Sequence, residues 1–447
     1  MIQVYTSFFK MTRDLLTPTG YSSVADRPAP AATALVEPSS QIDYDLVIVG
    51  GGLVGLTFAC ALRQSGLQVA LLEARPESAA VERGQAYHVN LQSSRIFRGI
   101  GAWQSMQAEV NPIAQIRLSD ADYPKVVQFL PADLGTPVLG YVAEHRVLLQ
   151  GLQHLVSQSQ NVTCFCPAEL LQADYQPDQV ILQVNVAGQK QTLRTRLLVA
   201  ADGARSPIRQ RANISTYGWQ YRQACVVAFI QPEKPHQNIA YERFWSSGPF
   251  AILPLPNNLC RIVWTAPKAE AEAILALDEA EFLARLQQRF GDQMGRLSLV
   301  GSRYLFPVQL MHSRRYVHPR LALIGDAAHC CHPVGGQGVN LGIRDAAALA
   351  EILSTAHRQG QDIGAWSILR RFEQWRQPEN WIILGFTDSL VRVFSNNWLP
   401  LVSLRRLGLW GLRRISPVRQ LALQLMTGLS GRQPIVATAE PLDPSCG

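Results

Sequence analysis

The sequence predicts an α/β protein in which a doubly wound domain is interwoven with an antiparallel-sheet domain and followed by C-terminal helices. Three observations predict this fold class. Short, almost wholly apolar runs at 45–49, 69–72, 197–201 and 321–324 are typical of buried parallel strands. Segments between them alternate polar and apolar residues, as antiparallel strands do. From Val339 onward the pattern is mostly helical.

The organising segment covers residues 45–73 and predicts a strand, a glycine turn, a helix and a second strand. The first strand leads directly into a Gly-x-Gly-x-x-Gly turn formed by Gly50, Gly52 and Gly55. The first glycine permits the tight turn, the second lets the backbone approach a pyrophosphate, and the third lets helix and strand pack closely. The helix over 56–64 would receive the phosphate charge at its N-terminus.

An acid follows this unit at the expected place. Glu73 ends the second strand, eighteen residues after Gly55, where an acidic side chain can accept hydrogen bonds from ribose hydroxyls. Three glycines alone are equally typical of an ordinary glycine-rich turn. Because strand, helix, second strand and acid all occur at the expected spacing, we predict a Rossmann-like dinucleotide-binding unit.

The amino-acid composition limits the classes of protein to which this chain can belong. The chain has 447 residues, of which 47% are hydrophobic, enough for a large core. Its eight cysteines include no Cys-x-x-Cys pair and follow no signal peptide, so we expect reduced thiols in a cytoplasmic protein. No apolar run reaches the ~18 residues that a membrane-spanning helix needs. We predict no nucleic-acid partner.

The formal net charge of +7 comes from one stretch of the chain. Between Asp388 and Glu440 there is no acid and no lysine. Without the arginines of this stretch, basic and acidic residues number 34 each. The arginines are Arg392, Arg405, Arg406, Arg413, Arg414, Arg419 and Arg432.

The middle of the chain predicts a mixture of elements. We expect a helix over 140–155, and an antiparallel meander from 162 to 196. A second set of strands follows over 225–266, with a helix pair over 270–290. The resulting division is a mobile tail at 1–41, one discontinuous domain at 42–115, 139–212 and 311–355, a substrate domain at 116–138 and 213–310, a helical region at 356–432, and a tail at 433–447.

A second motif follows the apolar strand at 197–201. Asp202 and Gly203 form a turn, after which Ser206 and Pro207 suit the N-cap and first position of a helix. Asp202 therefore lies at the carboxyl end of a strand, where parallel sheets bind ligands. A capped turn without any ligand is the alternative interpretation of this motif alone.

A third motif begins at the strand 321–324. Asp326, directly after Gly325, can accept hydrogen bonds from a polyol. A glycine-rich loop then leads through Pro333, Gly336 and Gly338 into a helix. The bare N–H groups of this loop, at the positive end of the helix dipole, would stabilise negative charge on a reduced flavin ring.

The run from His329 to His332, which includes Cys330 and Cys331, contains four potential metal ligands. Four adjacent residues cannot easily converge on one tetrahedral centre. We therefore predict no metal site and place these residues beside the cofactor.

Together, the three motifs in this order resemble the FAD-dependent aromatic hydroxylases of the para-hydroxybenzoate hydroxylase fold. The closer similarity is to the ubiquinone-biosynthesis hydroxylases of that superfamily. It rests on His332-Pro-Val-Gly-Gly-Gln-Gly-Val-Asn-Leu-Gly-Ile-Arg-Asp345 and is reinforced by the segments 387–396 and 404–409. It covers about 43–431, which is essentially all of the chain except its tails.

The resemblance implies roles for residues of these motifs. It implies that Asp202 and Gly203 serve FAD and the nicotinamide donor together, and that Asp326 holds the FAD ribitol. It also implies that Arg146, at the start of a helix, contacts the flavin. The full predicted cofactor site is Gly50, Gly52, Gly55, Glu73, Arg146, Asp202, Gly203, Asp326, Pro333, Gly336, Gly338, Val339 and Asn340.

The resemblance further implies a monooxygenase that hydroxylates a phenol during quinone biosynthesis, and we expect this phenol to be prenylated. FAD would be bound without a covalent link, reduced by NAD(P)H, and converted by O₂ into a C4a-hydroperoxide that delivers one oxygen atom to the ring. The sequence contains one dinucleotide fingerprint, which suits a transient NAD(P)H. The cofactor carries the chemistry, while the protein supplies orientation, a dry pocket and electrostatics.

Several alternatives stay open at this point. A related flavin hydroxylase or epoxidase could act on another aromatic or isoprenoid compound, and a non-catalytic FAD-holding subunit of a membrane assembly belongs to a different class. A phenol needs deprotonation, and His236, His312 and Tyr241 are unranked candidates for the base. No catalytic residue is assigned.

The C-terminal arginines predict a membrane contact through residues 397–417, on the inner face of the membrane. Asn396 or Asn397 would cap a helix that Pro417 ends, with an apolar arc at 401, 404, 407, 408, 411, 412 and 415. Arg405, Arg406, Arg413 and Arg414 would lie on the other side with Trp410, able to bind anionic lipid. A helix packed on the body with solvated arginines is the alternative.

Overall fold

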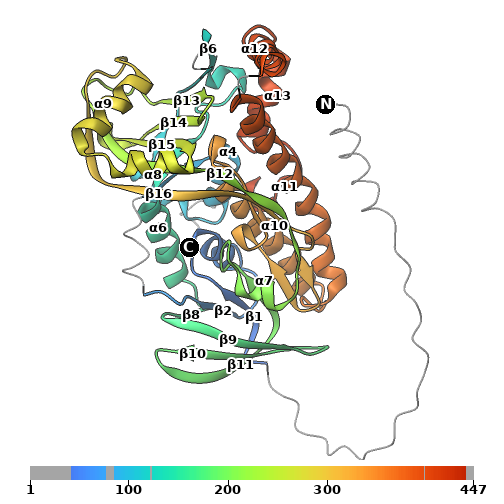
Figure 1. Ribbon diagram of the computed structural model, residues 1–447. Coiled ribbons are helices and arrows are strands. Elements are labelled where there is room, and N and C mark those ends of the chain that lie inside the picture. The colour runs from blue at the N-terminus through green and yellow to red at the C-terminus, as the bar shows by residue number, and fades with distance from the viewer. Residues whose placement is uncertain (1–41, 77–84, 121–122, 397, 439–447) are drawn as a thin grey trace, which may run out of the picture. The chain divides into compact units, whose positions relative to one another are not determined.

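The computed structural model describes residues 42–76, 85–120, 123–396 and 398–438, and the account below concerns these residues (Figure 1). The tail predicted over 1–41 lies outside them, as do Asn397 and residues 439–447 of the predicted C-terminal tail.

The first sheet forms around the glycine turn. Its order is β17-β18-β11-β1-β2-β8, with β10 and β9 added beside β11. Neighbours from β18 to β8 are parallel, so the carboxyl ends of β1, β2, β11 and β18 meet at one edge. The strands are β1 (Tyr44–Val49), β2 (Val69–Leu72), β8 (Val162–Phe165), β9 (Ala168–Tyr175), β10 (Val180–Val186), β11 (Gln189–Ala200), β17 (Val317–His318) and β18 (Leu321–Leu323).

The apolar runs in the sequence explain this sheet. The residues Leu46, Val69, Leu198 and Leu321 are all fully buried, because helices or strands cover both faces of the sheet. Because both faces of such a strand are buried, nearly all of its side chains are apolar. The strand therefore appears in the sequence as a short continuous hydrophobic run.

Three boundaries differ from the sequence prediction. The first helix, α2 (Leu53–Ala61), begins directly after Gly52, three residues earlier than predicted, and ends well before Gly66. Residues Tyr141–Glu144 form strand β7, and only His145–Ser157 is helical (α6). The prediction of an all-antiparallel meander was also wrong for β8, which pairs in parallel with β2 because it follows a helical crossover.

The second sheet has the order β19-β16-β12-β15-β14-β13-β5-β6 and lies with α8 and α9 in the upper part of Figure 1. All its neighbours are antiparallel except β13 and β5. The strands are β5 (Gln115–Asp120), β6 (Tyr123–Phe129), β12 (Thr216–Pro232), β13 (Ile239–Trp245), β14 (Gly248–Pro254), β15 (Cys260–Pro267), β16 (Leu297–Ser313) and β19 (His329–Cys330). A small third sheet joins β3 (Ala86–Val89), β7 and β4 (Asn111–Pro112).

The remaining helices cover the sheets. Two of them, α10 and α11, are long and run side by side. The predicted helix pair over 270–290 is confirmed as α8 and α9. The bounds are α4 (Leu91–Gly99), α5 (Trp103–Met106), α7 (Pro207–Arg211), α8 (Lys268–Ala276), α9 (Glu279–Phe290), α10 (Gly338–Arg358), α11 (Trp366–Phe394), α12 (Leu399–Arg414) and α13 (Ser416–Met426).

A buried polar network fixes α10 against α11. The Asp345 carboxylate on α10 accepts from Arg376 Nε at 2.9 Å and from Asn380 Nδ2 at 3.0 Å, both on α11. It also lies 2.6 Å from His329 Nε2. Burial alone would raise the pKa of Asp345, but His329 and Arg376 outweigh it and lower the pKa to about 2. The carboxylate is therefore ionised and paired.

The C-terminal helices differ from the prediction in where their arginines lie. Arg405 does not lie on a free surface, because its Nε donates to Asp120 Oδ2 at 2.7 Å and both side chains are buried. Arg419 and Arg432 likewise pair with carboxylates of the body, at Asp133 and Glu351. Arg392 instead pairs with Asp388, one turn earlier on the same helix. The N-cap of α12 is Trp398, not an asparagine. Three of the seven arginines thus attach this region to the rest of the protein.

Within the described residues, none of the helices combines the length and apolarity that crossing a membrane requires. The seven described cysteines form no disulfide with one another.

Candidate active site

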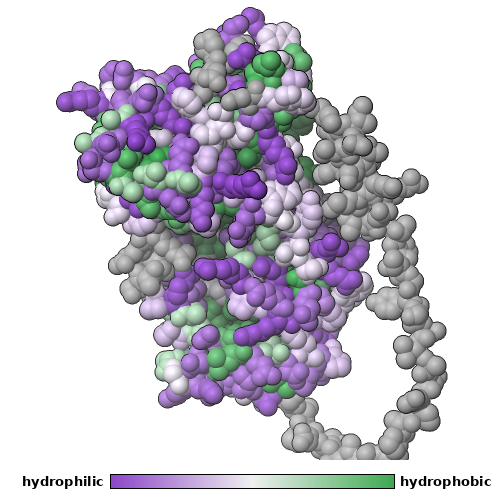
Figure 2. All heavy atoms as spheres, in the orientation of Figure 1, coloured by the Kyte–Doolittle hydropathy of each residue, from purple (hydrophilic) through white to green (hydrophobic). Residues whose placement is uncertain are grey.

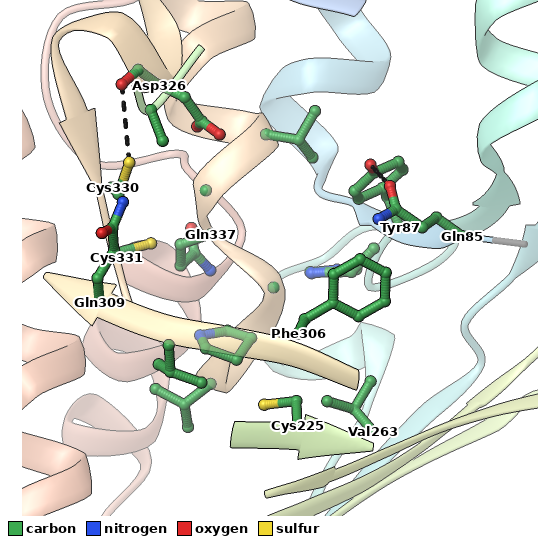
Figure 3. A pocket seen from close by; sticks show the side chains of 18 of the residues that line it. Gln85, Tyr87, Cys225, Val263, Phe306, Gln309, Asp326, Cys330, Cys331 and Gln337 are labelled. Carbon is green, nitrogen blue, oxygen red and sulfur yellow. Dashed lines mark hydrogen bonds between the residues drawn. The ribbon is translucent and has the colours of Figure 1, made fainter. Parts of the chain in front are cut away.

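The predicted motifs converge on one cavity of about 1580 Å³, lined by residues of both large sheets. Figure 3 shows side chains entering it from several elements. Asp326, Cys331 and Gln337 lie on one side, Tyr87 and Gln85 on another, and Cys225 and Val263 come from strands of the second sheet. The motifs and the antiparallel sheet therefore share one site.

The glycine turn leaves open space at the cavity. Gly50 has φ of +112°, and a Cβ on it would meet the Ala201 backbone, while a Cβ on Gly55 would collide with the Gly50 carbonyl. Gly52 differs, because a Cβ there would meet nothing within 4 Å and the residue lines the cavity. It is also the N-cap of α2, so the open space adjoins free N–H groups of the helix.

Glu73 braces this turn. Its Oε2 accepts from the Gly51 backbone N–H at 2.7 Å, and its Oε1 accepts from the Arg75 N–H at 2.9 Å. Arg75 Nε also donates to Oε1, at 3.3 Å, so Oε2 is the oxygen that keeps a lone pair for a further donor. The carboxylate lines the cavity.

Asp202 has an unsatisfied oxygen. Its Oδ2 accepts from the Ile208 N–H at 3.3 Å, while its Oδ1 is buried and has no hydrogen-bond partner among the described residues. Burial raises the pKa of this carboxyl above its ordinary value. Gly203 beside it has φ of +86°. Ser206 caps α7 by accepting from the Arg209 N–H at 3.0 Å, as predicted.

The third motif supplies a carboxylate and a loop. Asp326 is accessible from the cavity but surrounded by protein, and this desolvation raises its pKa. Pro333, Gly336, Gly338 and Val339 also line the cavity, ending at the first turn of α10.

Three predicted cofactor residues do not line the cavity. Gly55 lies against the Gly50 carbonyl, where a Cβ would collide. Asn340 is buried and holds the loop instead, because its Nδ2 donates to His88 O at 2.8 Å and to Gly336 O at 2.7 Å. Arg146 pairs with Glu109 at 2.8 Å and with Glu144 at 3.2 Å. Its neighbour His145 lines the cavity.

The four residues around Cys330 do not converge. Cys330 and Cys331 line the cavity, whereas His329 binds Asp345 and His332 Nδ1 accepts from the Val334 N–H at 3.1 Å. Burial raises the pKa of the Cys331 thiol to about 12, so it is protonated. No group of residues suited to a metal ion occurs in the part of the chain that the structure describes.

The three candidate bases face elsewhere. Both ring nitrogens of His236 are engaged, by Leu255 O and by the Asn238 N–H. His312 packs on Trp381 and contacts the Tyr316 hydroxyl at 3.0 Å. Tyr241 borders the cavity, but its ring packs edge-on against Phe290 of α9.

Sequence reasoning missed polar residues that strands bring to the cavity. Arg261 on β15 is buried and donates to Ala86 O, while burial lowers its pKa to about 10. The Tyr87 hydroxyl donates to Gln85. Glu242 on β13 also lines the cavity. A lone charged residue in an apolar strand was the available signal, and it is too common to identify a site.

The part of the cavity that lies against the second sheet and the C-terminal helices is largely apolar, and we call it the apolar end. Strands of the second sheet and helices α11, α12 and α13 form its wall. Its lining residues include Leu118, Phe129, Phe244, Ala251, Leu253, Val263, Phe386, Leu390, Leu412 and Met426.

The residues present fit FAD. Open space at Gly52 beside a helix N-terminus suits a pyrophosphate, and the unsatisfied Asp202 Oδ1 and the accessible Asp326 carboxylate suit hydroxyl donors. The fold and the site thus define an FAD-dependent monooxygenase of the two-sheet aromatic hydroxylase class.

Comparisons with known proteins agree. A family model described as "FAD binding domain" matches residues 43–385. An uncharacterized protein of Synechocystis is 51% identical over 89% of this chain and 96% of its own length. Ubiquinone hydroxylase UbiL of Rhodospirillum rubrum is 39% identical, covering 89% and 93%. The 3-demethoxyubiquinol 3-hydroxylase of Escherichia coli is 32% identical, covering 86% and 98%.

Among solved structures, p-nitrophenol 4-monooxygenase PnpA from Pseudomonas putida matches with a TM-score of 0.73 at 19% identity, covering 88% of this chain and 99% of that one. This likeness shows the fold. The chain belongs to the FAD binding domain family and, within it, to the group that contains the ubiquinone-biosynthesis hydroxylases. The predictions of fold class, family and FAD are confirmed.

Proposed function

We propose that this protein hydroxylates the aromatic ring of a prenylated phenol in quinone biosynthesis, using FAD, NAD(P)H and O₂. One observation carries the proposal: a single cavity joins the FAD motifs to a long apolar end beside the C-terminal helices. A ring placed near the motifs leaves the apolar end for an isoprenoid tail. The names of relatives that act on ubiquinone precursors support the same substrate class.

We infer that different residues of the chain bind different parts of FAD. When bound, FAD supplies the redox chemistry, by taking a hydride from NAD(P)H and activating O₂ for transfer of one oxygen atom. We infer that the 50–55 turn binds its pyrophosphate, Glu73 a ribose, Asp326 the ribitol, and the loop from Pro333 to Val339 the flavin ring. Asp202 and Gly203 would serve FAD and NAD(P)H together. Asn340 would act by holding the loop.

Substrate-dependent oxidation of NAD(P)H tests the activity. The holoenzyme should consume NAD(P)H faster when 2-prenylphenol is present and should insert one ¹⁸O atom from labelled O₂, read by product mass. Lipid extracts of a deletion strain should accumulate an under-hydroxylated quinone precursor. The absence of both substrate-dependent NAD(P)H oxidation and oxygen insertion, with every phenol tried, would contradict the proposal and favour a non-catalytic subunit.

We also propose that α12 contacts an anionic membrane, where a prenylated substrate resides. Its outer surface, which we call the α12 patch, combines apolar and basic side chains, and Figure 2 shows hydrophobic residues exposed beside hydrophilic ones there. Trp398 and Leu407 are 64% and 62% exposed. The patch consists of Trp398, Leu399, Leu407, Trp410, Arg406, Arg413 and Arg414. Leu412, on the same helix, lines the cavity, so the helix separates the membrane from the apolar end.

Vesicle co-sedimentation tests this contact. Binding to phosphatidylglycerol vesicles at low salt should fall when Arg406, Arg413 and Arg414 become glutamine, since each arginine contributes roughly 1 kcal/mol at an acidic surface. The matched control changes exposed Arg285, Arg315 and Arg358 instead, which removes the same charge elsewhere. Equal loss in both triple variants, or no binding by the wild type, would refute the contact.

A further inference from the structure

One carboxylate stands in the apolar wall of the cavity. Glu242 lies near the middle of β13, and the sheet register pairs it with Leu118 of β5 on one side and Ala251 of β14 on the other. Ala251 in turn pairs with Val263 of β15, and Val263 with Val227 of β12. All five residues line the cavity. Glu242 is the polar exception in this row.

The side chain of Glu242 faces the cavity and not the outer helices. Side chains alternate along a strand, and Tyr241 packs against Phe290 of α9 on the opposite face. Ala240 and Phe244, on the same face as Glu242, belong to an apolar cluster with Leu118. A group on this face can reach a ligand in the cavity.

Glu242 has no hydrogen bond or ion pair with any described residue. The cavity-facing residues of β5 and β14 carry no charge, and neither do Phe386 and Leu390 of α11. The titratable groups of β12 and β15 that line the cavity are Tyr221, Cys225 and Arg261, and Arg261 donates to Ala86 O. Lys268, at the start of α8, also lines the cavity. Burial raises the pKa of Glu242 to about 8.

The other carboxylates that line the cavity belong elsewhere. Glu73, Asp202 and Asp326 lie on the cofactor motifs, and Glu169 lies on β9 of the first sheet. Among the described lining residues, Glu242 is therefore the carboxylate of the apolar end. A buried polar group without a partner costs stability, so its place here indicates a ligand that pairs with it.

We propose that Glu242 is a catalytic residue that binds the phenolic hydroxyl of the substrate and accepts its proton; this rests on the proposed function. The phenol O–H bond breaks, its electron pair stays on the oxygen, and the proton forms an O–H bond on Glu242, with no change of oxidation state. The phenolate is richer in electrons and reacts faster with an electrophilic oxygen donor. The proton returns to that oxygen when the hydroxylated product forms.

The environment suits this step. A carboxyl with an ordinary pKa near 4 is a poor base for a phenol, whose pKa is about 10. A raised pKa of the carboxyl reduces the difference between the two pKa values. The neighbours of Glu242 in its sheet row are apolar, so this carboxylate supplies the polar group there and also orients the ring.

The test compares wild type with Glu242→Gln, which keeps the shape and hydrogen bonding of the side chain but cannot accept a proton. Hydroxylation of 2-prenylphenol by the FAD-loaded enzyme is measured between about pH 6 and 10. Wild-type kcat/KM should rise with pH as the carboxylate ionises around the pKa that burial gives it. The variant should be about 10²-fold slower at neutral pH and should lose that rise. Glu281→Gln, exposed on α9, is the matched control and should behave as wild type.

Two further readouts separate the outcomes. Retention of FAD and the rate of flavin reduction by NAD(P)H without a phenol should be unchanged in Glu242→Gln, which excludes misfolding. Difference spectra of bound 4-nitrophenol, whose ionised form is yellow, should show phenolate in wild type at a lower pH than in the variant. Turnover within threefold of wild type, or an unchanged pH profile, overturns the role of Glu242. If the wild type hydroxylates no phenol but Glu242 still ionises the bound nitrophenol, the proposed function is wrong. The role of Glu242 in accepting the phenolic proton then stands.

Discussion

The two ends of the cavity are built differently. At the cofactor end, short turns after buried strands present backbone N–H groups and three carboxylates, so each feature is contained in a few consecutive residues. At the apolar end, separate side chains come from strands of the second sheet and from helices α11, α12 and α13, which lie far apart in the sequence. The first kind of site leaves a motif in the sequence, and the second leaves none.

The two ends are also held together differently. The cofactor end depends on close backbone packing, as at Gly55, where no Cβ fits. The apolar end depends on side-chain contacts between distant segments, as in the buried pair of Asp120 and Arg405, which are 285 residues apart. We therefore expect substitutions at the first end to remove FAD, and those at the second to loosen the substrate wall while FAD stays bound.

The largest effect is expected for Gly52→Val. The added side chain occupies the open space where the pyrophosphate would lie, so the purified protein should be colourless while circular dichroism remains that of a folded chain. Gly408→Val is the matched control, because a Cβ there also meets nothing within 4 Å. A Gly52→Val protein with stoichiometric FAD would show that the phosphate site is misplaced.

Arg405→Gln should destabilise the protein by about 3–5 kcal/mol, because it leaves the Asp120 carboxylate buried without its partner. Urea unfolding measures the loss, and bound FAD should remain near stoichiometric below the transition. Arg406→Gln, one residue along and exposed, should change stability by less than about 0.5 kcal/mol. Equal effects would mean that the pair does not anchor α12.

Asp326→Ala and Asp202→Ala should distinguish FAD binding from nicotinamide binding at the cofactor end. Each loses a hydrogen bond to a charged group, about 1.5–3 kcal/mol, so both should bind FAD more weakly. Asp202→Ala should also slow flavin reduction by NAD(P)H at saturating FAD, followed by stopped-flow absorbance. An unchanged reduction rate in Asp202→Ala would remove its proposed part in nicotinamide binding.

The last prediction concerns pH and the buried imidazole of His332. Burial lowers the pKa of His332 to about 3, so below pH 6.5 the unfolded chain binds a proton that the folded chain refuses. The free energy of unfolding should therefore fall as the pH drops from 6.5 towards 3, by about 1.4 kcal/mol per unit for this group.

His332→Gln should reduce that slope between about pH 6.5 and 5, measured by urea unfolding across the range. An unchanged slope in His332→Gln would show that folding does not lower the pKa of His332.

The sequence by itself determined the α/β fold class, the glycine turn, the two Asp-Gly and Gly-Asp motifs and the FAD site they indicate. This was possible because buried parallel strands are continuous hydrophobic runs and because a phosphate-binding turn requires glycine at fixed spacing. The exposed arginines of α12 were also predicted, although Arg405 was not distinguished from them.

Only the tertiary structure decided which side chains meet in the cavity. Arg146 and Arg405 both pair with carboxylates, at Glu109 and Asp120, which belong to other segments of the chain. Glu242 came to the apolar end through the register of β13 with β5 and β14. Register depends on contacts between segments far apart in the chain, and a shift of one residue would move each side chain to the opposite face, so no local pattern could place them.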